Sequence, residues 1–413
     1  MTRSQFLRES KGQPAGAADM PWEGPGALSH SRGANITHAA SHNRSLLLHE
    51  IRAGRDMDRM SLAKMTGLTP PGVFKIVTEL LDEKWIVSSR VKDGSRGQPR
   101  TVLSINPDAA YSIGLTIDRD RLVFVALDFA GNIKCHWQHE ARLASARDAG
   151  AFVERCVGAI REKRPFSLHK VAAIGFSMPN DYSVDGAQEG ESRLGKSHWN
   201  EIFGPLNHLP IIQENDAAAA SIGEMMFGAG LTAESFFYVY ISIGLGGGLV
   251  VNRQYIRGRH GRSGELGYLP QVNPFRQRKS CLGQTLEQVV SLQGLADALG
   301  SAGDDNEISL IENALRVGDP RLTEWVEDAS ELLYLPLLSV LCTLDPGAIF
   351  IGGRLPKTIL AQLCVSLSKR LSLNLGVHWP QMVVRPALLS EDSAAVGAAV
   401  LALSKLWDRR AVD

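Results

Sequence analysis

The 413-residue chain has few cysteines and no long run of hydrophobic residues. Its five cysteines are an odd number scattered between Cys135 and Cys364, so we expect reduced thiols rather than a framework of disulfides. The most apolar stretch, residues 332–344, contains Pro336 and Ser339 and is shorter than the roughly 20 residues that cross a bilayer. We therefore expect a buried helix there and no membrane partner.

A net charge and a targeting signal are also missing. The 44 basic side chains balance the 44 acidic ones, and the first 40 residues contain no apolar core of a secretory signal. A cytoplasmic location is expected. The balance hides a local excess, because residues 42–100 carry 11 basic and 7 acidic side chains, a net of +4. Such an excess is typical of a surface that binds nucleic acid.

Composition and periodicity divide the chain into three parts. Residues 1–38 are rich in Ser, Gly, Ala and Pro and predict a disordered tail. Residues 39–108 predict short amphipathic helices followed by two strands. In residues 109–413, β-rich runs alternate with helical segments, which predicts an α/β domain whose helices cover its sheets. Strands are expected at residues 112–117, 122–128, 171–177, 211–214, 236–243, 248–251 and 348–351.

The second part has the order of a winged helix-turn-helix. A helix at residues 43–53 precedes a second helix that Ser61 is expected to cap, and Gly67 supplies the turn that follows. The third helix is expected at residues 70–84, with Thr69 as its N-cap and a proline at its first position. The N-terminal turns of such a third helix face base edges in the major groove of DNA.

A basic, glycine-rich segment then joins two strands, at residues 86–91 and 101–105. Four basic side chains against the single Asp93 give this wing a charge of +3, which suits contact with phosphates or the minor groove. A protein-docking module or a solvated face is the alternative. The residues predicted to bind DNA are Gly72, Lys75, Thr78, Arg90, Lys92, Arg96 and Arg100.

Several motifs of the third part resemble the ROK (repressor, open reading frame, kinase) family. They are ENDAAAA at residues 214–220 with Gly-Glu at 223–224, IGLGGG at 243–248 and SGELG at 263–267. The winged segment resembles that of the family's repressor branch, and the resemblance covers roughly residues 40–405. It implies a two-lobed actin-like ATPase/sugar-kinase (ribonuclease H-like) fold with a sugar in the cleft between the lobes.

The resemblance also assigns a sugar site. In kinases of the family, the Asn of the Asn-Asp pair holds sugar hydroxyls and the Asp is the general base, while two glutamates accept hydroxyl hydrogen bonds. A helix cap or turn for the Asn-Asp pair and an exposed helix carboxylate for the second glutamate are the alternatives. The implied sugar-binding residues are Asn215, Asp216, Glu265, Tyr268 and Glu287, with Tyr268 in place of the family's histidine.

The chain departs from the family's kinases in two places. Their first phosphate-binding loop, Asp-x-Gly-Gly-Thr, is replaced by Asp-Arg-Asp-Arg at residues 118–121, which puts side chains and a negative charge where phosphates would lie. We therefore expect no phosphoryl transfer, only a vestigial base in Asp216, and no cofactor. The family's zinc ligands are replaced by Tyr268, Arg278, Ser280 and Thr285, so no metal is expected.

Together these features predict a DNA-binding transcriptional regulator of carbohydrate metabolism genes, a repressor rather than an enzyme, with activation left open. Its partners would be operator DNA and a sugar or sugar derivative, and a homodimer or homotetramer would match a palindromic operator. Two alternatives remain. One is an active sugar kinase with a DNA-binding head, and the other is a regulator whose effector is a protein.

Overall fold

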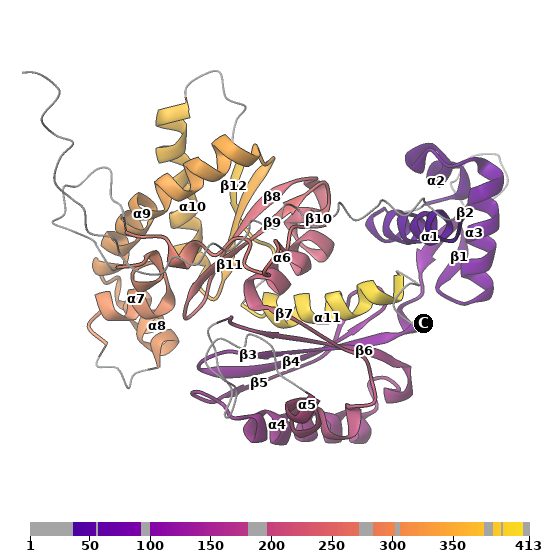
Figure 1. The fold of residues 1–413 in the computed structure, drawn as a ribbon, viewed down its shortest axis with the longest axis horizontal. Helices are drawn as coiled ribbons and strands as arrows, with labels where there is room; N and C mark the ends of the chain where they lie inside the picture. The colour runs from indigo at the N-terminus through magenta and orange to yellow at the C-terminus, as the bar shows by residue number, and fades with distance from the viewer. Residues whose placement is uncertain are drawn as a thin grey trace, which may run out of the picture.

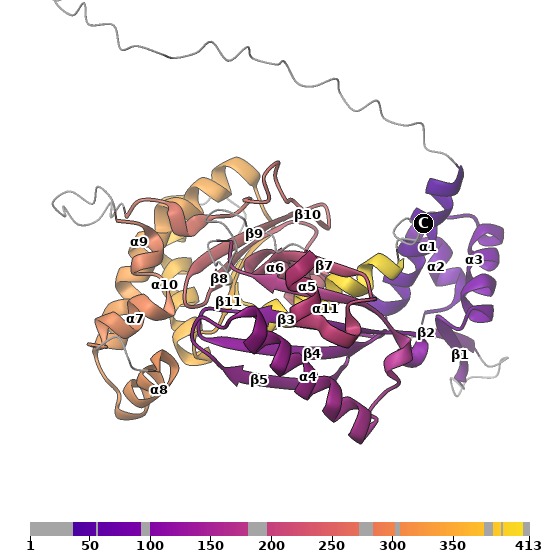
Figure 2. The same ribbon diagram turned by 60° about the horizontal axis from the view of Figure 1, so that its bottom comes forward.

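The computed structural model describes residues 36–54, 57–91, 100–180, 196–271, 284–301, 306–375, 383–389 and 391–407. A small head (residues 36–105) lies at one end of the molecule, next to the C-terminal helix and away from the helices at the opposite end (Figures 1 and 2). Two larger lobes make up the rest. The predicted tail ends inside the first helix, because residues 36–38 already form its first turn; residues 1–35 lie outside the described part.

Three helices and a hairpin form the head. Leu47, Leu62, Val73 and Leu80 are fully buried where the helices meet. The two strands pair antiparallel, with Ile86 opposite Ile105. The elements are α1 (Ile36–Ala53), α2 (Arg59–Thr66), α3 (Pro70–Asp82), β1 (Ile86–Val91) and β2 (Arg100–Ile105).

The helix ends of the head confirm two predictions and correct one. Thr69 caps α3, and Gly67 ends α2 in the left-handed conformation at φ +68°. Ser61 does not cap α2. Asp58 does, because its carboxylate lies three residues ahead and accepts a hydrogen bond from the Ser61 N–H at 2.7 Å. The third helix ends at Asp82, two residues before the predicted end.

The first lobe contains a five-stranded mixed sheet in the order β5-β4-β3-β6-β7. Two helices cover one face of the sheet and the C-terminal helix covers the other (Figure 1). The strands are β3 (Tyr111–Ile117), β4 (Arg121–Asp128), β5 (Ile133–Glu140), β6 (Val171–Met178) and β7 (Ile211–Asn215), and the helices are α4 (Ala146–Lys163), α5 (Lys196–Phe203) and α11 (Ser393–Trp407).

The second lobe repeats this sheet, in the order β10-β9-β8-β11-β12. In each sheet the three strands that come first in the chain pair antiparallel, and the two later strands are added in parallel next to β3 or β8. The same topology in two sheets confirms the predicted two-lobed fold. The elements are α6 (Asp216–Phe227), β8 (Phe236–Ile241), β9 (Leu245–Val251), β10 (Gln254–Tyr255), α7 (Leu292–Ala298), α8 (Glu307–Val317), α9 (Arg321–Leu344), β11 (Ala348–Gly353), α10 (Lys357–Leu375) and β12 (Val383–Pro386).

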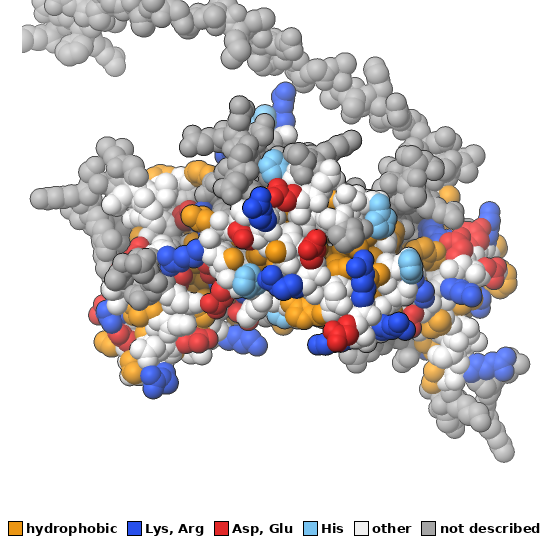
Figure 3. All heavy atoms as spheres, turned by 90° about the horizontal axis from the view of Figure 1, so that it is seen from below, with side chains coloured by type: hydrophobic (Ala, Val, Ile, Leu, Met, Phe, Trp, Pro, Cys, Tyr) orange, Lys and Arg blue, Asp and Glu red, His pale blue; other side chains and the backbone are white. Residues whose placement is uncertain are grey.

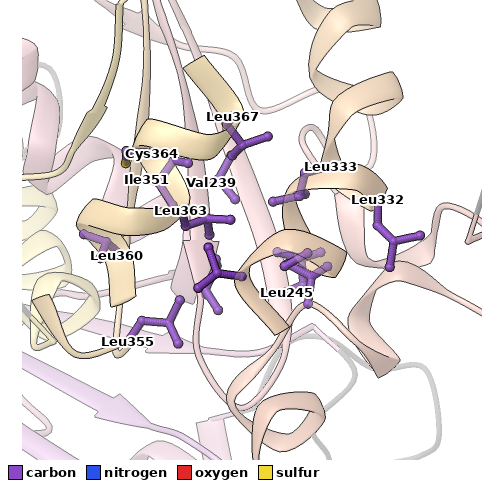
Figure 4. Packing of buried hydrophobic residues seen from close by; sticks show 14 of the residues in the cluster. Val239, Leu245, Leu332, Leu333, Ile351, Leu355, Leu360, Leu363, Cys364 and Leu367 are labelled. Atoms are coloured by element: carbon purple, nitrogen blue, oxygen red, sulfur yellow. The ribbon is translucent and has the colours of Figure 1, made fainter. Parts of the chain in front are cut away.

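The core of the second lobe lies between its sheet and two long helices. Figure 4 shows Val239 and Ile351 of the strands beside Leu363 and Leu367 of α10, with Leu333 of α9 opposite, and all five are fully buried. The apolar stretch at residues 332–344 belongs to α9, as predicted. The described cysteines are all free.

Three strands were not predicted. β5 was missed although Ile133, Cys135 and Trp137 alternate with polar residues, which is the pattern of a half-buried strand; most of its side chains are exposed. β10 has two residues and β12 has four, too few for a periodic signal. β9 starts at Leu245 instead of Gly248, because the glycine run itself pairs with β8, and β8 ends at Ile241 instead of Ile243.

The backbone of α11 approaches the first sheet and α6 unusually closely. A Cβ atom on Gly175 would lie 1.7 Å from the Ala398 carbonyl oxygen, and one on Gly114 would lie 2.0 Å from that of Ala395. On the other side of α11, a Cβ on Gly397 would lie 1.8 Å from the carbonyl oxygen of α6 residue Ala219. Glycine is therefore required here for close helix packing.

Charges on the outside are mixed. Basic and acidic side chains lie interspersed on the face seen in Figure 3. No described helix has the length and apolar character that crossing a membrane requires.

Candidate ligand cleft and DNA-reading head

All five residues predicted to bind sugar line a single cleft between the lobes. Asn215 and Asp216 stand where β7 passes into α6. Glu265 and Tyr268 lie at the two ends of a short 3-10 turn, and Glu287 lies in a second one, residues 286–288. Segments far apart in the chain thus bring three carboxylates, an amide and a phenol to one place.

Asn215 caps α6, as the helix-cap alternative predicts, and it also lines the cleft. Its Oδ1 atom accepts hydrogen bonds from the N–H groups of Ala217 (3.0 Å) and Ala218 (3.2 Å), which caps α6. Asp216 lies in the first turn of α6 and is 9% exposed, where the positive end of the helix dipole favours its negative charge. The cap fixes both side chains at the cleft.

The glutamates already have partners on the two sides of the cleft. Asn180, at the end of β6, donates from Nδ2 to Glu265 Oε1 at 2.6 Å. Glu287 accepts from the Leu245 N–H at 3.1 Å and lies 3.6 Å from the Arg119 guanidinium. Tyr268 is 57% exposed and forms part of the rim. A sugar would exchange these contacts for its own hydroxyls.

The cleft is narrow. Its volume of about 40 Å³ has room for only a few water molecules. Arg119 contributes to the closure, since its guanidinium extends beside Gly244 and toward Glu287. A monosaccharide would therefore enter only after the lobes separate or Arg119 withdraws.

An ion-pair cluster joins the lobes beside this cleft. Arg354, directly after β11, donates to both carboxylate oxygens of Asp120 at 2.6 and 2.7 Å and lies 3.2 Å from Asp118. The Ser242 hydroxyl donates to Asp118 at 2.8 Å. We call Asp118, Asp120 and Arg354 the interlobe clamp. Burial alone would lower the pKa of Arg354, but the hydrogen bonds and negative charges of the aspartates outweigh burial and raise it.

The clamp changes the interpretation of residues 118–121. Asp120 had been expected only to repel phosphates. Its charge is neutralised by Arg354, a residue that the sequence did not single out, although it directly follows the Gly-Gly pair at 352–353. The guanidinium and the two carboxylates are 4%, 18% and 5% exposed, so the clamp fills this side of the cleft with protein atoms.

In the head, α3 presents one face to solvent. Lys75 is exposed, Thr78 and Gly72 are partly exposed, and Phe74 is 59% exposed between them. The Arg59 guanidinium lies 5.1 Å from the centre of the Phe74 ring. We call Phe74, Lys75 and Thr78 the reading face. Phe74 is not among the residues predicted to bind DNA, but it precedes Lys75 and lies four residues before Thr78 on the same exposed side of α3.

Of the four basic wing residues predicted to bind DNA, two lie within the described part of the chain. Arg90 is exposed on β1, whereas Lys92 and Arg96 lie outside the described residues. Arg100 bonds to the Asp58 carboxylate at 2.5 Å and to the Ser61 hydroxyl at 3.2 Å. Burial raises the pKa of Asp58, but hydrogen bonds from Ser61 and Arg100 lower it below its ordinary value. Arg100 therefore fastens the wing to the start of α2.

Comparisons with known proteins agree with this arrangement. A model of the ROK family matches residues 204–405. The xylose repressor of Bacillus subtilis is 24% identical over 388 residues, which are 91% of this chain and 98% of the repressor. The beta-glucoside kinase of Listeria monocytogenes is 32% identical over 203 residues, 47% of this chain and 67% of the kinase.

A solved structure supports the fold. The crystal structure of a ROK family transcriptional regulator, a homologue of the Escherichia coli Mlc protein, covers 90% of this chain and 97% of its own, at 21% identity and a TM-score of 0.67. The similarity to this regulator and to the xylose repressor extends over the head as well as both lobes, whereas the kinase matches about half of the chain.

Proposed function

The chain belongs to the ROK family, and from this premise we propose that it is a DNA-binding transcriptional regulator controlled by a sugar in the interlobe cleft. The observation that carries the proposal is the reading face: Phe74 and Lys75 are exposed and Thr78 is partly exposed, all within the first three turns of α3 and away from the head's core. In a winged helix-turn-helix, these turns enter the major groove. The similarity to a repressor over nearly its whole length supports repression.

The interlobe clamp supports regulation without phosphoryl transfer. Phosphoryl transfer depends on backbone amides and cations that hold the phosphates in line. Arg354 donates to Asp118 and Asp120 instead, and the Arg119 side chain lies beside Gly244, at the start of the glycine run at residues 244–248. ATP would have to break a buried ion-pair network before its phosphates could bind. Asp216 then serves as a sugar ligand and only vestigially as a base.

An active kinase remains the second candidate, because Asp216 and the glycine run at residues 244–248 are both present and kinases are among the relatives. As a regulator, the protein would bind a palindromic operator as a homodimer or homotetramer, with one head in each half-site. A protein effector in place of the sugar is the third possibility.

Thermal melting against a panel of monosaccharides, amino sugars, their phosphates and ATP tests the proposal. We expect one sugar to raise the melting temperature, ATP to leave it unchanged, and the same sugar to change retention of DNA selected from a random library. Binding of ATP followed by sugar-dependent turnover would establish the kinase instead. Selected DNA with no response to any sugar would favour a protein effector.

Phe74 predicts a preference for thymine. An apolar ring among base edges contacts the 5-methyl group of thymine, which cytosine lacks. Burial of one methyl group corresponds to about 0.8 kcal/mol, or roughly a fourfold change in affinity. We expect deoxyuridine in place of the contacted thymine in selected DNA to weaken binding about fourfold for the wild type and not at all for Phe74→Ala.

Two controls accompany this measurement. Deoxyuridine at thymines outside the conserved half-sites should change nothing. Lys75→Ala should weaken binding but keep the wild-type sensitivity to deoxyuridine, because its ammonium group does not contact the methyl. Equal sensitivity to deoxyuridine in the wild type and Phe74→Ala would place Phe74 away from the bases.

A further inference from the structure

The C-terminal half of α1 contacts the second lobe at a small set of residues. The His49 Nε2 atom lies 2.5 Å from Nη1 of Arg253, which stands in the hairpin between β9 and β10. Three residues on, the Arg52 guanidinium lies 4.6 Å from the centre of the Phe227 ring and 3.7 Å from the Met226 sulfur. We call these five residues the head contact.

The head contact is half-buried and electrostatically unusual. Burial, together with the charges of Arg52 and Arg253, lowers the pKa of His49 to about 4, so its ring is neutral at physiological pH. The neutral ring accepts one hydrogen bond, from Arg253 at Nε2 or from Arg52, whose Nη2 lies 3.1 Å from Nδ1. Burial and Arg253 also lower the pKa of Arg52 to about 10. The head contact adds these polar and cation–π contacts to an apolar cluster that continues from the head to Met226 of α6 and Leu403 of α11.

Arg253 is itself held firmly. Asn252 and Arg253 adopt positive φ angles of +51° and +57°, which non-glycine residues rarely do. The Arg253 N–H donates to the Glu234 carbonyl at 2.7 Å, and its guanidinium donates to the Leu231 carbonyl at 3.1 Å. The hairpin thus presents a fixed guanidinium to the head.

Two stiff elements connect the head contact with the cleft. α6 starts with Asp216 in the cleft and ends with Met226 and Phe227, and twelve helical residues span about 18 Å. β9 starts with Leu245, whose N–H bonds to Glu287, and ends at the hairpin that carries Arg253. The two elements pack against each other. A ligand that moves Asp216 or Glu287 therefore moves the lobe residues of the head contact, which are Phe227 at the end of α6 and Arg253 in the hairpin.

The head can transmit such a movement because its helices share one core. Leu47 and Ile51, on the same helix as His49 and Arg52, belong to one buried cluster with Val73 of α3, and this cluster continues to Met226 at the end of α6. Well-packed cores shift as units rather than deform continuously. A displacement of α1 is thus a displacement of the reading face.

Resting on the proposed function, we propose that Arg253 and Arg52 are positioning residues: they set the orientation of the head relative to the lobes, so that sugar in the cleft changes how α3 fits DNA. The coupling belongs to α6 and the β9–β10 hairpin, not to the interlobe clamp. Coupling free energies between two ligand sites typically change affinity by a factor of about 5–150, and the proposed coupling between sugar and DNA requires no more than this.

The test is the ratio of the DNA dissociation constants measured with and without the effector sugar. Full-length wild type should give a ratio of about 5–150. Arg253→Ala should bring the ratio close to one while the dissociation constant for the sugar alone stays within about twofold of the wild type. Arg253→Lys, which keeps the charge but not the fork of donors, should restore part of the ratio.

Two further variants complete the test. His49→Leu removes the same bond from the side of the head, so it should lower the ratio as Arg253→Ala does. Because it leaves the hairpin unchanged, a lowered ratio in this variant cannot come from a folding defect of the hairpin. Arg316→Ala, an exposed arginine on α8 that bonds within its own helix to Asn313, should keep the wild-type ratio. Wild-type ratios in both Arg253→Ala and His49→Leu would overturn the positioning role. A wild type that binds no DNA, or whose DNA binding ignores every sugar, would overturn the proposed function, and this inference with it.

Discussion

Replacement of Arg354 by alanine is expected to lower the free energy of unfolding by about 3–5 kcal/mol, because removal of one partner leaves buried charges uncompensated. The side chains of Arg354 and Asp118 are 4% and 5% exposed, and Asp120 loses two short hydrogen bonds. Denaturant unfolding followed by circular dichroism measures the loss. The effect should be among the largest of any single substitution in the chain.

A compensating variant separates charge from packing. Combining Arg354→Gln with Asp120→Asn removes two of the three charges of the clamp and keeps polar atoms in place. It leaves Asp118 as the one uncompensated charge instead of two, so it should cost less stability than Arg354→Ala alone. Arg316→Ala is the matched surface control and should change stability by less than about 0.5 kcal/mol. If Arg354→Ala unfolds like that control, the two lobes are not held together by the clamp.

Asp216→Asn is expected to weaken binding of the effector sugar by about 10- to 150-fold, since a hydrogen bond to a charged group contributes about 1.5–3 kcal/mol. Affinity for DNA without sugar should stay at the wild-type value, because Asp216 lies in the cleft and the reading face lies in the head. The variant would remain on DNA at sugar concentrations that release the wild type. Titration calorimetry and DNA retention measure the two quantities separately.

Asp297→Asn is the control for this substitution, because Asp297 is an exposed carboxylate on α7 that bonds only locally to Gln293. It should leave sugar binding unchanged. If Asp216→Asn binds the sugar as tightly as the wild type does, the site must lie elsewhere than at the start of α6.

The sequence alone predicts what depends on near neighbours in the chain. Gly67 and Thr69 mark the turn and the start of α3 because their roles rest on local backbone conformation and a cap three residues away. Asn215 and Asp216 were predicted as site residues because they belong to a motif that resembles the ROK family. The structure places both in the same cleft as Glu265. Ser61 was mistaken for a cap because Asp58 and Ser61 are both good caps, and only the geometry chooses between them.

What the sequence could not predict depends on contacts between distant residues. Asp120 and Arg354 are 234 positions apart, and His49 and Arg253 are 204 apart. Each looks like an ordinary surface charge until the fold brings its partner close. Phe74 differs from these pairs, because the helical spacing of Val73, Val77 and Leu80 already marks the buried face and leaves Phe74 outside it; its apolar character alone made it easy to overlook.

The position of α11 has a consequence for how the protein is made. The first sheet is complete in sequence at β7, but one of its faces is covered by a helix that the ribosome adds only after residue 392. At synthesis rates of about 5–20 residues per second, the wait between β7 and α11 is on the order of 10–35 s. Gly114 and Gly175 leave a groove on the waiting sheet that only α11 fills. The three helices of the head are synthesised first, but their apolar cluster continues to Phe129, Met226 and Leu403, so the packing of the head against the lobes is complete only after α11 has formed.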